Sequence, residues 1–238
     1  MSKLSREFIL QRAQKSCEVA SAIRDAWEWE EWSAEEMLQE MSRVKGLQNV
    51  LSGAEAAADG ARGELDGALG RVYAMALTGT GLARVKWRGD AGRRRILKSV
   101  DLNNNGRPAM RLAAQQWASA WSRLEVAWVL PLADGASISH AAYQSLRREI
   151  EGDALASPVV PGLLENLESA VLTVRGAADD LQKALKGLEG LMEAWYAAAT
   201  AVFGEDTAEG RQLRGQVPTT YVPVPAAGPG GRTKAIPA

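Results

Sequence analysis

Apolar residues recur at alternating steps of three and four along two long stretches, and this spacing constrains the fold more than any other feature. Such a repeat places its members on one face of an α-helix, as the a and d positions of a heptad. The first run is Val44, Leu47, Leu51, Ala54, Ala58, Ala61, Leu65, Ala68, Val72 and Met75. The second run is Leu164, Leu167, Val171, Val174, Ala178, Leu181, Leu185, Leu188, Met192, Trp195, Ala199 and Val202. Each run predicts one long helix whose apolar seam packs against other helices.

The positions of the prolines support a helical fold. The first of nine is Pro108, and five lie within the last 21 residues. Because proline breaks helix interiors, the long proline-free stretch favours helices. We therefore expect an all-α protein, an elongated antiparallel helical bundle formed by residues 1–215. Residues 216–238 are rich in proline and glycine, and we expect them to form an extended or disordered C-terminal arm.

Several shorter helices accompany the two long ones in this prediction. They are expected at residues 5–31, at 93–100, from 109 onward, at 137–151 and at 206–215. Ser33 with Glu36 resembles a capping box at the start of the first long helix, and Asp206 is expected to cap the last helix. On the helix that starts near residue 109, three tryptophans share one face (Trp117, Trp121 and Trp128). We interpret them as core packing opposite alanine-rich helices rather than as a ligand shelf.

The composition argues against catalysis. The chain has one histidine, His140, and one cysteine, Cys17, so the usual metal ligands and catalytic bases are scarce. No nucleophile, base and orienting group occur at a usable spacing, and we expect a non-enzyme without cofactor or metal. Cys17 is expected to be a buried apolar residue. His140 is expected to be exposed, and the sequence identifies no partner for it.

Two short motifs resemble ligand-binding loops only in part. Residues 101–106 (DLNNNG) match the first half of a calcium loop, but Leu112 stands where the bidentate glutamate is required. Gly79 and Gly81 are a fragment of a phosphate-binding fingerprint without the strand that should precede it. We expect a turn in the first case and no nucleotide site in the second.

Net charge is −1, so no global field favours nucleic acid or an anionic membrane. A local basic cluster does occur, at Arg84, Lys86, Arg88, Arg93, Arg94, Arg95 and Lys98. An acidic stretch carries Glu28, Glu30, Glu31, Glu35, Glu36 and Glu40. We expect the basic cluster to make an electrostatic contact, either with helix carboxyl ends or with such an acidic stretch, and we keep nucleic acid as a less favoured partner.

Glycines form a stripe on the first long helix. Gly46, Gly53, Gly60 and Gly67 recur every seven residues, and Gly63 and Gly70 fall on a neighbouring heptad position. With Val44 at position a, these are positions c and f, roughly opposite the apolar seam. Six glycines inside a helix cost on the order of 5 to 6 kcal/mol relative to alanine, so a closely packed backbone should offset them. That backbone belongs either to another helix of the same chain or to a second subunit.

The tail contains side chains that can anchor an extended peptide. Pro218, Tyr221, Val222 and Val224 lie in the segment PTTYVPVP. A segment already close to polyproline II loses little entropy on docking. We expect an arm that lies on a neighbouring subunit, with a plain flexible end as the alternative.

These features together predict a non-catalytic structural protein that self-assembles into a filament, tubule, shell or higher homo-oligomer. Heterologous contacts between helix faces propagate into open polymers unless the rotation closes. The alternative is a helical adaptor or chaperone-like module that binds another protein. The sequence contains no apolar run of about 18 residues and no signal peptide, so we expect no membrane association. A cytoplasmic location, or one in a virion or other assembled particle, is the corresponding expectation.

Overall fold

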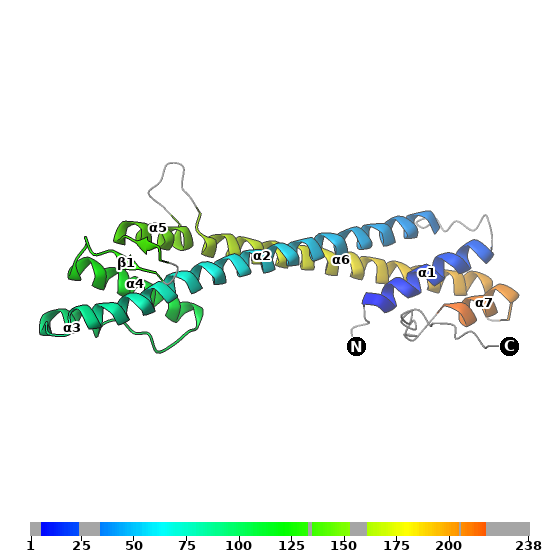
Figure 1. Cartoon of the computed structure of the whole chain (residues 1–238). Coiled ribbons are helices and arrows are strands. Elements are labelled where there is room, and N and C mark those ends of the chain that lie inside the picture. Colours follow the sequence, from blue (N-terminus) through cyan, green and yellow to red (C-terminus); the bar gives the residue numbers. More distant parts are fainter. Residues whose placement is uncertain (1–5, 24–33, 133–134, 153–160, 205, 218–238) are drawn as a thin grey trace, which may run out of the picture. The chain divides into compact units, whose positions relative to one another are not determined.

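A computed structural model describes residues 6–23, 34–132, 135–152, 161–204 and 206–217 (Figure 1). The described part is built from helices, apart from one antiparallel pair of two-residue strands. The helices are α1 (Arg6–Ile23), α2 (Ala34–Lys86), α3 (Ala91–Leu97), α4 (Arg107–Leu124), α5 (His140–Glu151), α6 (Leu163–Phe203) and α7 (Ala208–Gln216). The strands are β1 (Leu130–Pro131) and β2 (Ser137–Ile138). The all-α helical bundle with two long helices, α2 and α6, is thus confirmed.

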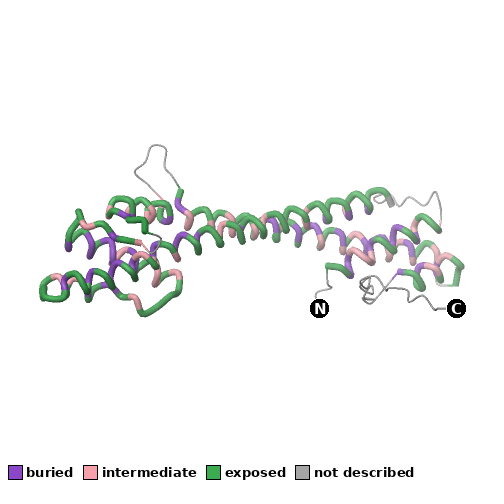
Figure 2. Tube along the Cα trace, in the orientation of Figure 1, coloured by how far each residue is buried: buried purple, intermediate pink, exposed green. Residues whose placement is uncertain are grey.

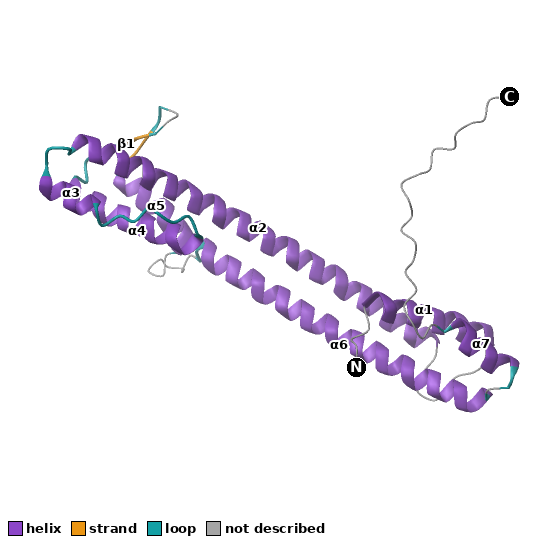
Figure 3. Ribbon diagram, turned by 90° about the horizontal axis from the view of Figure 1, so that it is seen from below, coloured by secondary structure: helices purple, strands orange, loops and turns teal. Residues whose placement is uncertain are grey.

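The chain divides into two units, and α2 and α6 contribute to both. Unit 1 comprises residues 1–50 and 177–238, and unit 2 comprises residues 51–176. Within each unit the segments of α2 and α6 lie alongside one another (Figure 3) and run in opposite directions, as the colours along the chain show (Figure 1). The predicted boundary between a helical domain and an arm at residue 216 stays a prediction, because residues 218–238 lie outside the described part.

Unit 1 combines α1 and α7 with the start of α2 and the second half of α6. Helix α1 buries Phe8, Ala13 and Val19, and α6 buries Leu188 and Met192 (Figure 2). Burial raises the pKa of the Cys17 thiol to about 11, as expected for a packed cysteine that is not reactive near neutrality. The helix predicted at residues 5–31 is described only as far as Ile23, and Ser33 of the predicted capping box also lies outside the described residues.

The cap of α7 differs from the prediction. Thr207, not Asp206, is the N-cap residue, and its hydroxyl accepts a hydrogen bond of 3.0 Å from the backbone N–H of Gly210. The helix therefore starts one residue later than the acidic pattern indicated. Both residues are of a type that caps helices, so the sequence does not distinguish them.

Unit 2 is centred on aromatic residues. Trp117, Trp121 and Tyr143 are fully buried, and the Tyr143 hydroxyl donates a hydrogen bond of 3.1 Å to the carbonyl of Val72. Core packing of the tryptophans is confirmed, although Trp128 lies beyond the end of α4 at Leu124. The indole N–H of Trp121 donates a hydrogen bond of 3.1 Å to the carbonyl of Trp128, which holds the chain that follows α4 against this helix. The centroids of the Trp121 and Trp128 rings are 5.9 Å apart.

The two predicted seams agree with burial to different degrees. All ten seam positions of α2 are buried or half-buried. On α6 the residues Ala178 and Val202 are exposed instead, and Ala177 and Ala184 are buried. Both buried alanines lie one residue before a predicted seam position, so the buried face of α6 departs from a strict heptad there.

Candidate functional site

The glycine stripe on α2 lies in open space. A Cβ atom built at Gly46, Gly53, Gly60, Gly63 or Gly70 would have no atom within 4 Å, apart from the two adjacent residues and the nearby backbone of α2 itself. At Gly67 it would meet only the guanidinium of Arg71, at 3.8 Å. Among the described residues no second helix packs on the stripe. The alternative that a helix of the same chain covers these glycines is therefore wrong for this part of the chain.

The stripe itself is small and uncharged, although charged residues flank it. Between residues 46 and 70, positions c and f hold six glycines with Asn49 and Ala56, and no charged side chain. Leu77 continues the f row, and its side chain is 43% exposed. Val50 is 57% exposed and lies four residues after Gly46 and three before Gly53, hence on the same side of the helix. An apolar knob thus stands beside hollows formed by glycine.

The basic cluster lies where α2 turns into α3, and we call residues 84–98 the basic turn. Two of its cations belong to the fold. The Lys86 ammonium is 3.0 Å from a carboxylate oxygen of Glu125 and 4.9 Å from the centre of the Trp87 ring. The Arg93 guanidinium lies 5.2 Å from the same ring and 3.6 Å from Asp90. These contacts fix the corner around Trp87, which is 5% exposed.

The other cations of the basic turn face outward. Within the described part of the chain, the side chains of Arg84, Arg88, Arg94, Arg95 and Lys98 are exposed and meet no acidic side chain. Arg94, Arg95 and Lys98, with Ala91, line a hollow of about 280 Å³. As expected for cations at helix carboxyl ends, Arg84 lies in the last turn of α2 and Arg94 and Arg95 in that of α3. The sequence shows the cluster, but the spacing alone does not separate the two cations that make contacts within the fold from the five that meet no acidic side chain.

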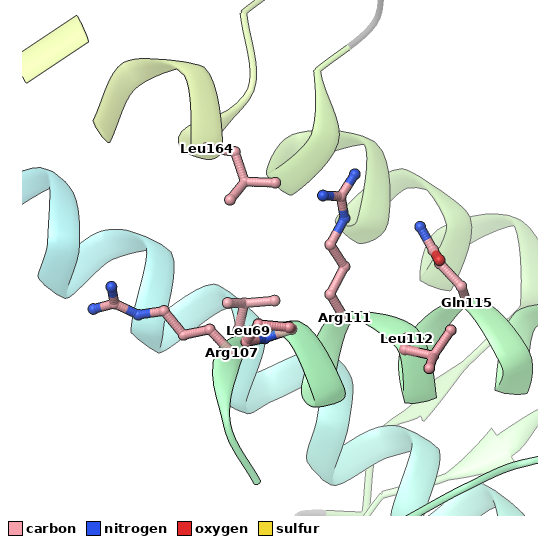
Figure 4. A pocket seen from close by; sticks show the side chains of 7 residues that line it. Leu69, Arg107, Arg111, Leu112, Gln115 and Leu164 are labelled. Atoms are coloured by element: carbon pink, nitrogen blue, oxygen red, sulfur yellow. The ribbon is translucent and has the colours of Figure 1, made fainter. Parts of the chain in front are cut away.

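A groove in unit 2 escaped the sequence analysis. It has a volume of about 460 Å³ and lies among α2, α4 and the start of α6 (Figure 4). Leu69, Leu112 and Leu164 supply its apolar surface, and Arg107 and Arg111 supply its cations. No heptad or motif signal marks it, because its residues come from three separate helices.

The arginines of this groove are already paired. Arg107 makes a bidentate contact with Asp66, with one N–O distance of 2.6 Å, and its hydrogen bonds lower the pKa of Asp66. Arg111 lies 3.4 Å from Glu151. Burial tends to raise the pKa of Glu151, but hydrogen bonds from Gln115 and the two neighbouring arginines, Arg111 and Arg147, lower it overall. The groove therefore resembles a structural seam between helices more than a place for acid–base chemistry.

Two residues singled out from the sequence have local structural contacts. His140 is half-buried, not exposed: its Nε2 lies 3.2 Å from the carbonyl of Ala118, and its ring packs 5.5 Å from that of Trp121. The expectation of an exposed histidine is wrong, because α5 folds back on α4. Gly79 lies inside α2, where a Cβ would overlap the indole of Trp117, so its role is close packing and not phosphate binding.

The loop at residues 101–106 forms turns, as expected. The side chain of Asp101 accepts a hydrogen bond from the N–H of Asn103 at 3.0 Å, and that of Asn104 accepts one from Gly106 at 3.1 Å. The oxygens that a cation would need are thus used locally. The described residues contain no group of three or more His, Cys, Asp or Glu side chains that could hold a metal ion.

The remaining candidates are the tail residues. Pro218, Tyr221, Val222 and Val224 lie outside the described part of the chain. No helix among the described residues is long and apolar enough to cross a membrane. Comparison with protein-family models, with curated proteins and with solved structures finds no match to this chain.

Proposed function

We propose that this protein is a non-catalytic structural subunit that assembles with copies of itself through the glycine stripe of α2, helped by the C-terminal arm. A filament, tubule, shell or other higher homo-oligomer would be the product. The observation that supports the proposal most strongly is the open space over the stripe glycines.

The exposed glycines cost the helix about 1 kcal/mol each relative to alanine. Nothing in the described part of the chain packs on them and offsets that cost. A second backbone lying along the stripe would offset it, because glycine lets helices approach closely and gain dispersion contacts. The stripe positions themselves carry no charged side chain, so contact at the glycines requires no desolvation of ions there.

The proposed contact uses knobs and hollows on one face. Val50 of one subunit fits a hollow beside a glycine of the next, and Leu77 offers a second apolar knob. Contact between identical stripes gives a two-fold pair, and contact between the stripe and another surface gives a chain of subunits. Either geometry produces an oligomer that dissociates on dilution.

The test replaces the small residues by leucine. The triple substitution Gly53→Leu, Gly60→Leu and Gly67→Leu fills the space beside the stripe. A Cβ at positions 53 and 60 meets no atom within 4 Å, and at position 67 it meets only the end of the Arg71 side chain, at 3.8 Å. We expect the variant to fold, with an unchanged far-UV circular dichroism spectrum, and to sediment as a monomer at concentrations where the unmodified protein associates.

A matched control uses glycines of α6 that also lie in open space: Gly176→Leu, Gly187→Leu and Gly190→Leu. This control adds the same apolar volume elsewhere and should leave association unchanged. Equal association of the stripe variant and the unmodified protein would refute the stripe as the subunit contact. A monomeric protein that captures a different chain would instead support the adaptor alternative.

A further inference from the structure

Two segments of this chain each carry charges of mainly one sign. Residues 25–40 contain seven acidic residues and no basic residue, and residues 84–98 contain seven basic residues and one acidic residue. The rest of the chain is nearly balanced, since the whole molecule has a net charge of −1. Complementary patches of this kind steer association and fix its register.

The structure separates the cations that hold the fold from those that are free to bind. Lys86 and Arg93 are engaged with Glu125, Asp90 and Trp87. The remaining five are exposed, and three of them surround the hollow on α3 formed with Ala91. A concentration of unpaired positive charge at one corner repels itself unless an anion occupies it.

We propose that the basic turn of one subunit binds the acidic segment, residues 25–40, of a second copy of this chain. The proposal rests on self-assembly and adds a second contact to it, of a head-to-tail kind. Glutamate carboxylates of the incoming segment would enter the hollow and accept charge-assisted hydrogen bonds from Arg94, Arg95 and Lys98. Of the described acids in that segment, Glu35 is exposed, and Glu40 is bound only by its neighbour Arg43, at 3.3 Å.

The composition of the acidic segment suits this corner. It carries Trp27, Trp29 and Trp32 between its glutamates. Indole faces attract guanidinium groups, and the contact of Arg93 with Trp87 shows that pairing already at the basic turn. The segment therefore offers both carboxylates and aromatic faces to the free arginines.

The charge balance favours this occupant over nucleic acid. A domain that binds nucleic acid through its surface charge is usually strongly basic. This chain has a sequence pI of about 6.0 and a net charge of −1, so it has no general positive field that would attract phosphate. An acidic segment of an identical chain matches the patch without any excess charge.

The experiment exchanges the signs of the two segments. The first variant carries Arg94→Glu, Arg95→Glu and Lys98→Glu, and the second carries Glu30→Lys, Glu31→Lys and Glu35→Lys. We expect each variant alone to associate at least tenfold more weakly than the unmodified protein in sedimentation velocity at low salt. An equimolar mixture of the two should regain association, because each basic segment again meets an acidic one.

A third variant controls for charge in general, with Arg123→Glu, Arg148→Glu and Lys186→Glu at exposed positions outside the basic turn. It should associate as the unmodified protein does. If both exchanged variants associate normally while the stripe leucine variant does not, this inference fails and self-assembly through the stripe stands. Failure of the mixture to regain association also overturns the inference, since a contact within one chain would behave in that way.

Nucleic acid is the remaining outcome of this test. The unmodified protein is titrated with a fluorescent single-stranded 30-nucleotide DNA and with a duplex of equal length. We expect no salt-dependent binding. Binding that the first variant abolishes would overturn the inference and assign the basic turn to nucleic acid.

Discussion

Two glycines on one turn of α2 have opposite surroundings. A Cβ at Gly79 would lie 2.6 Å from Cε2 of Trp117, whereas a Cβ at Gly81 would meet nothing within 4 Å. Gly79 is thus required by the aromatic core of unit 2, and Gly81 by nothing in the described part of the chain.

Substitution by alanine should separate these two roles. We expect Gly79→Ala to lower the free energy of unfolding by about 1 to 3 kcal/mol, because a rigid ring must move. Gly81→Ala should raise it by about 0.5 to 1 kcal/mol through better helix propensity. Urea unfolding at the lowest measurable protein concentration checks both, and a change of the same sign in the two variants would contradict the packing of Trp117 on Gly79.

Tyr143 makes the free energy of unfolding depend on pH in the alkaline range. Burial raises the pKa of its hydroxyl well above the ordinary value, and the hydroxyl donates to the Val72 carbonyl. An unfolded tyrosine releases its proton near pH 10. The native protein keeps the proton, so this residue contributes stability that is present below about pH 10 and is lost as the pH rises further.

The variant Tyr143→Phe tests that linkage. Its free energy of unfolding should be about 1 kcal/mol lower at pH 7, because the hydrogen bond is absent. Between about pH 10 and 11.5 this free energy should fall less steeply than that of the unmodified protein. Tyr73→Phe is the control, since that hydroxyl also donates to a backbone carbonyl, of Leu102 at 2.9 Å. Identical pH slopes for the unmodified protein and Tyr143→Phe would contradict the assignment.

For single residues, the sequence predicted burial and spacing better than it predicted which side chains contact one another. The glycine stripe, the buried Cys17 and the packed tryptophans follow from spacing and composition. The contacts of Lys86 with Glu125 and of His140 with Ala118 join residues 39 and 22 positions apart, and no local pattern encodes them. They depend on how α4 and α5 fold back, which is a tertiary property.

The helix α2 combines an apolar seam with a stripe that weakens it as an isolated helix. The alanine substitutions Gly53→Ala, Gly60→Ala and Gly67→Ala should therefore act in opposite directions on folding and on assembly. We expect the unfolding free energy to rise by roughly 1 to 3 kcal/mol in total, because an added Cβ meets nothing within 4 Å at positions 53 and 60 and only an ordinary contact with Arg71 at position 67. Association should weaken, because the added methyl groups hold the partner backbone away.

Thermal unfolding and sedimentation velocity of the same variant give the two readouts. The corresponding substitutions on α6, Gly176→Ala, Gly187→Ala and Gly190→Ala, should stabilise the fold without affecting association. A stripe variant that is more stable and also associates normally would remove the reason for the glycines proposed here.

Element boundaries were less predictable than element types. The long helices are strongly periodic, so both were found, but α4 ends at Leu124 although the apolar spacing continues to Trp128. The chain turns there because Glu125 adopts an extended backbone. Trp128 lies outside the helix, but its ring still packs against that of Trp121. The short pair β1 and β2 was not predicted, since two residues per strand carry no usable period.

At the scale of the whole molecule, the role proposed for the C-terminal arm can be tested by truncation. The deletion should begin at residue 218, because Val217 is 3% exposed and its N–H donates to the carbonyl of Leu213 at 3.1 Å. We expect removal of residues 218–238 to leave the circular dichroism spectrum and thermal unfolding unchanged and to weaken association. Unchanged association after this deletion would exclude the arm from the subunit contacts.

The proposed function requires copies of this chain to bind one another through exposed helix faces. Sedimentation velocity of the unmodified protein over about a thousandfold range of concentration, with negative-stain microscopy of the most concentrated sample, detects such binding. We predict a weight-average sedimentation coefficient that rises with concentration and regular oligomers or polymers in the images. A single monomeric species over the whole range, with no ordered particles, would contradict the proposed function.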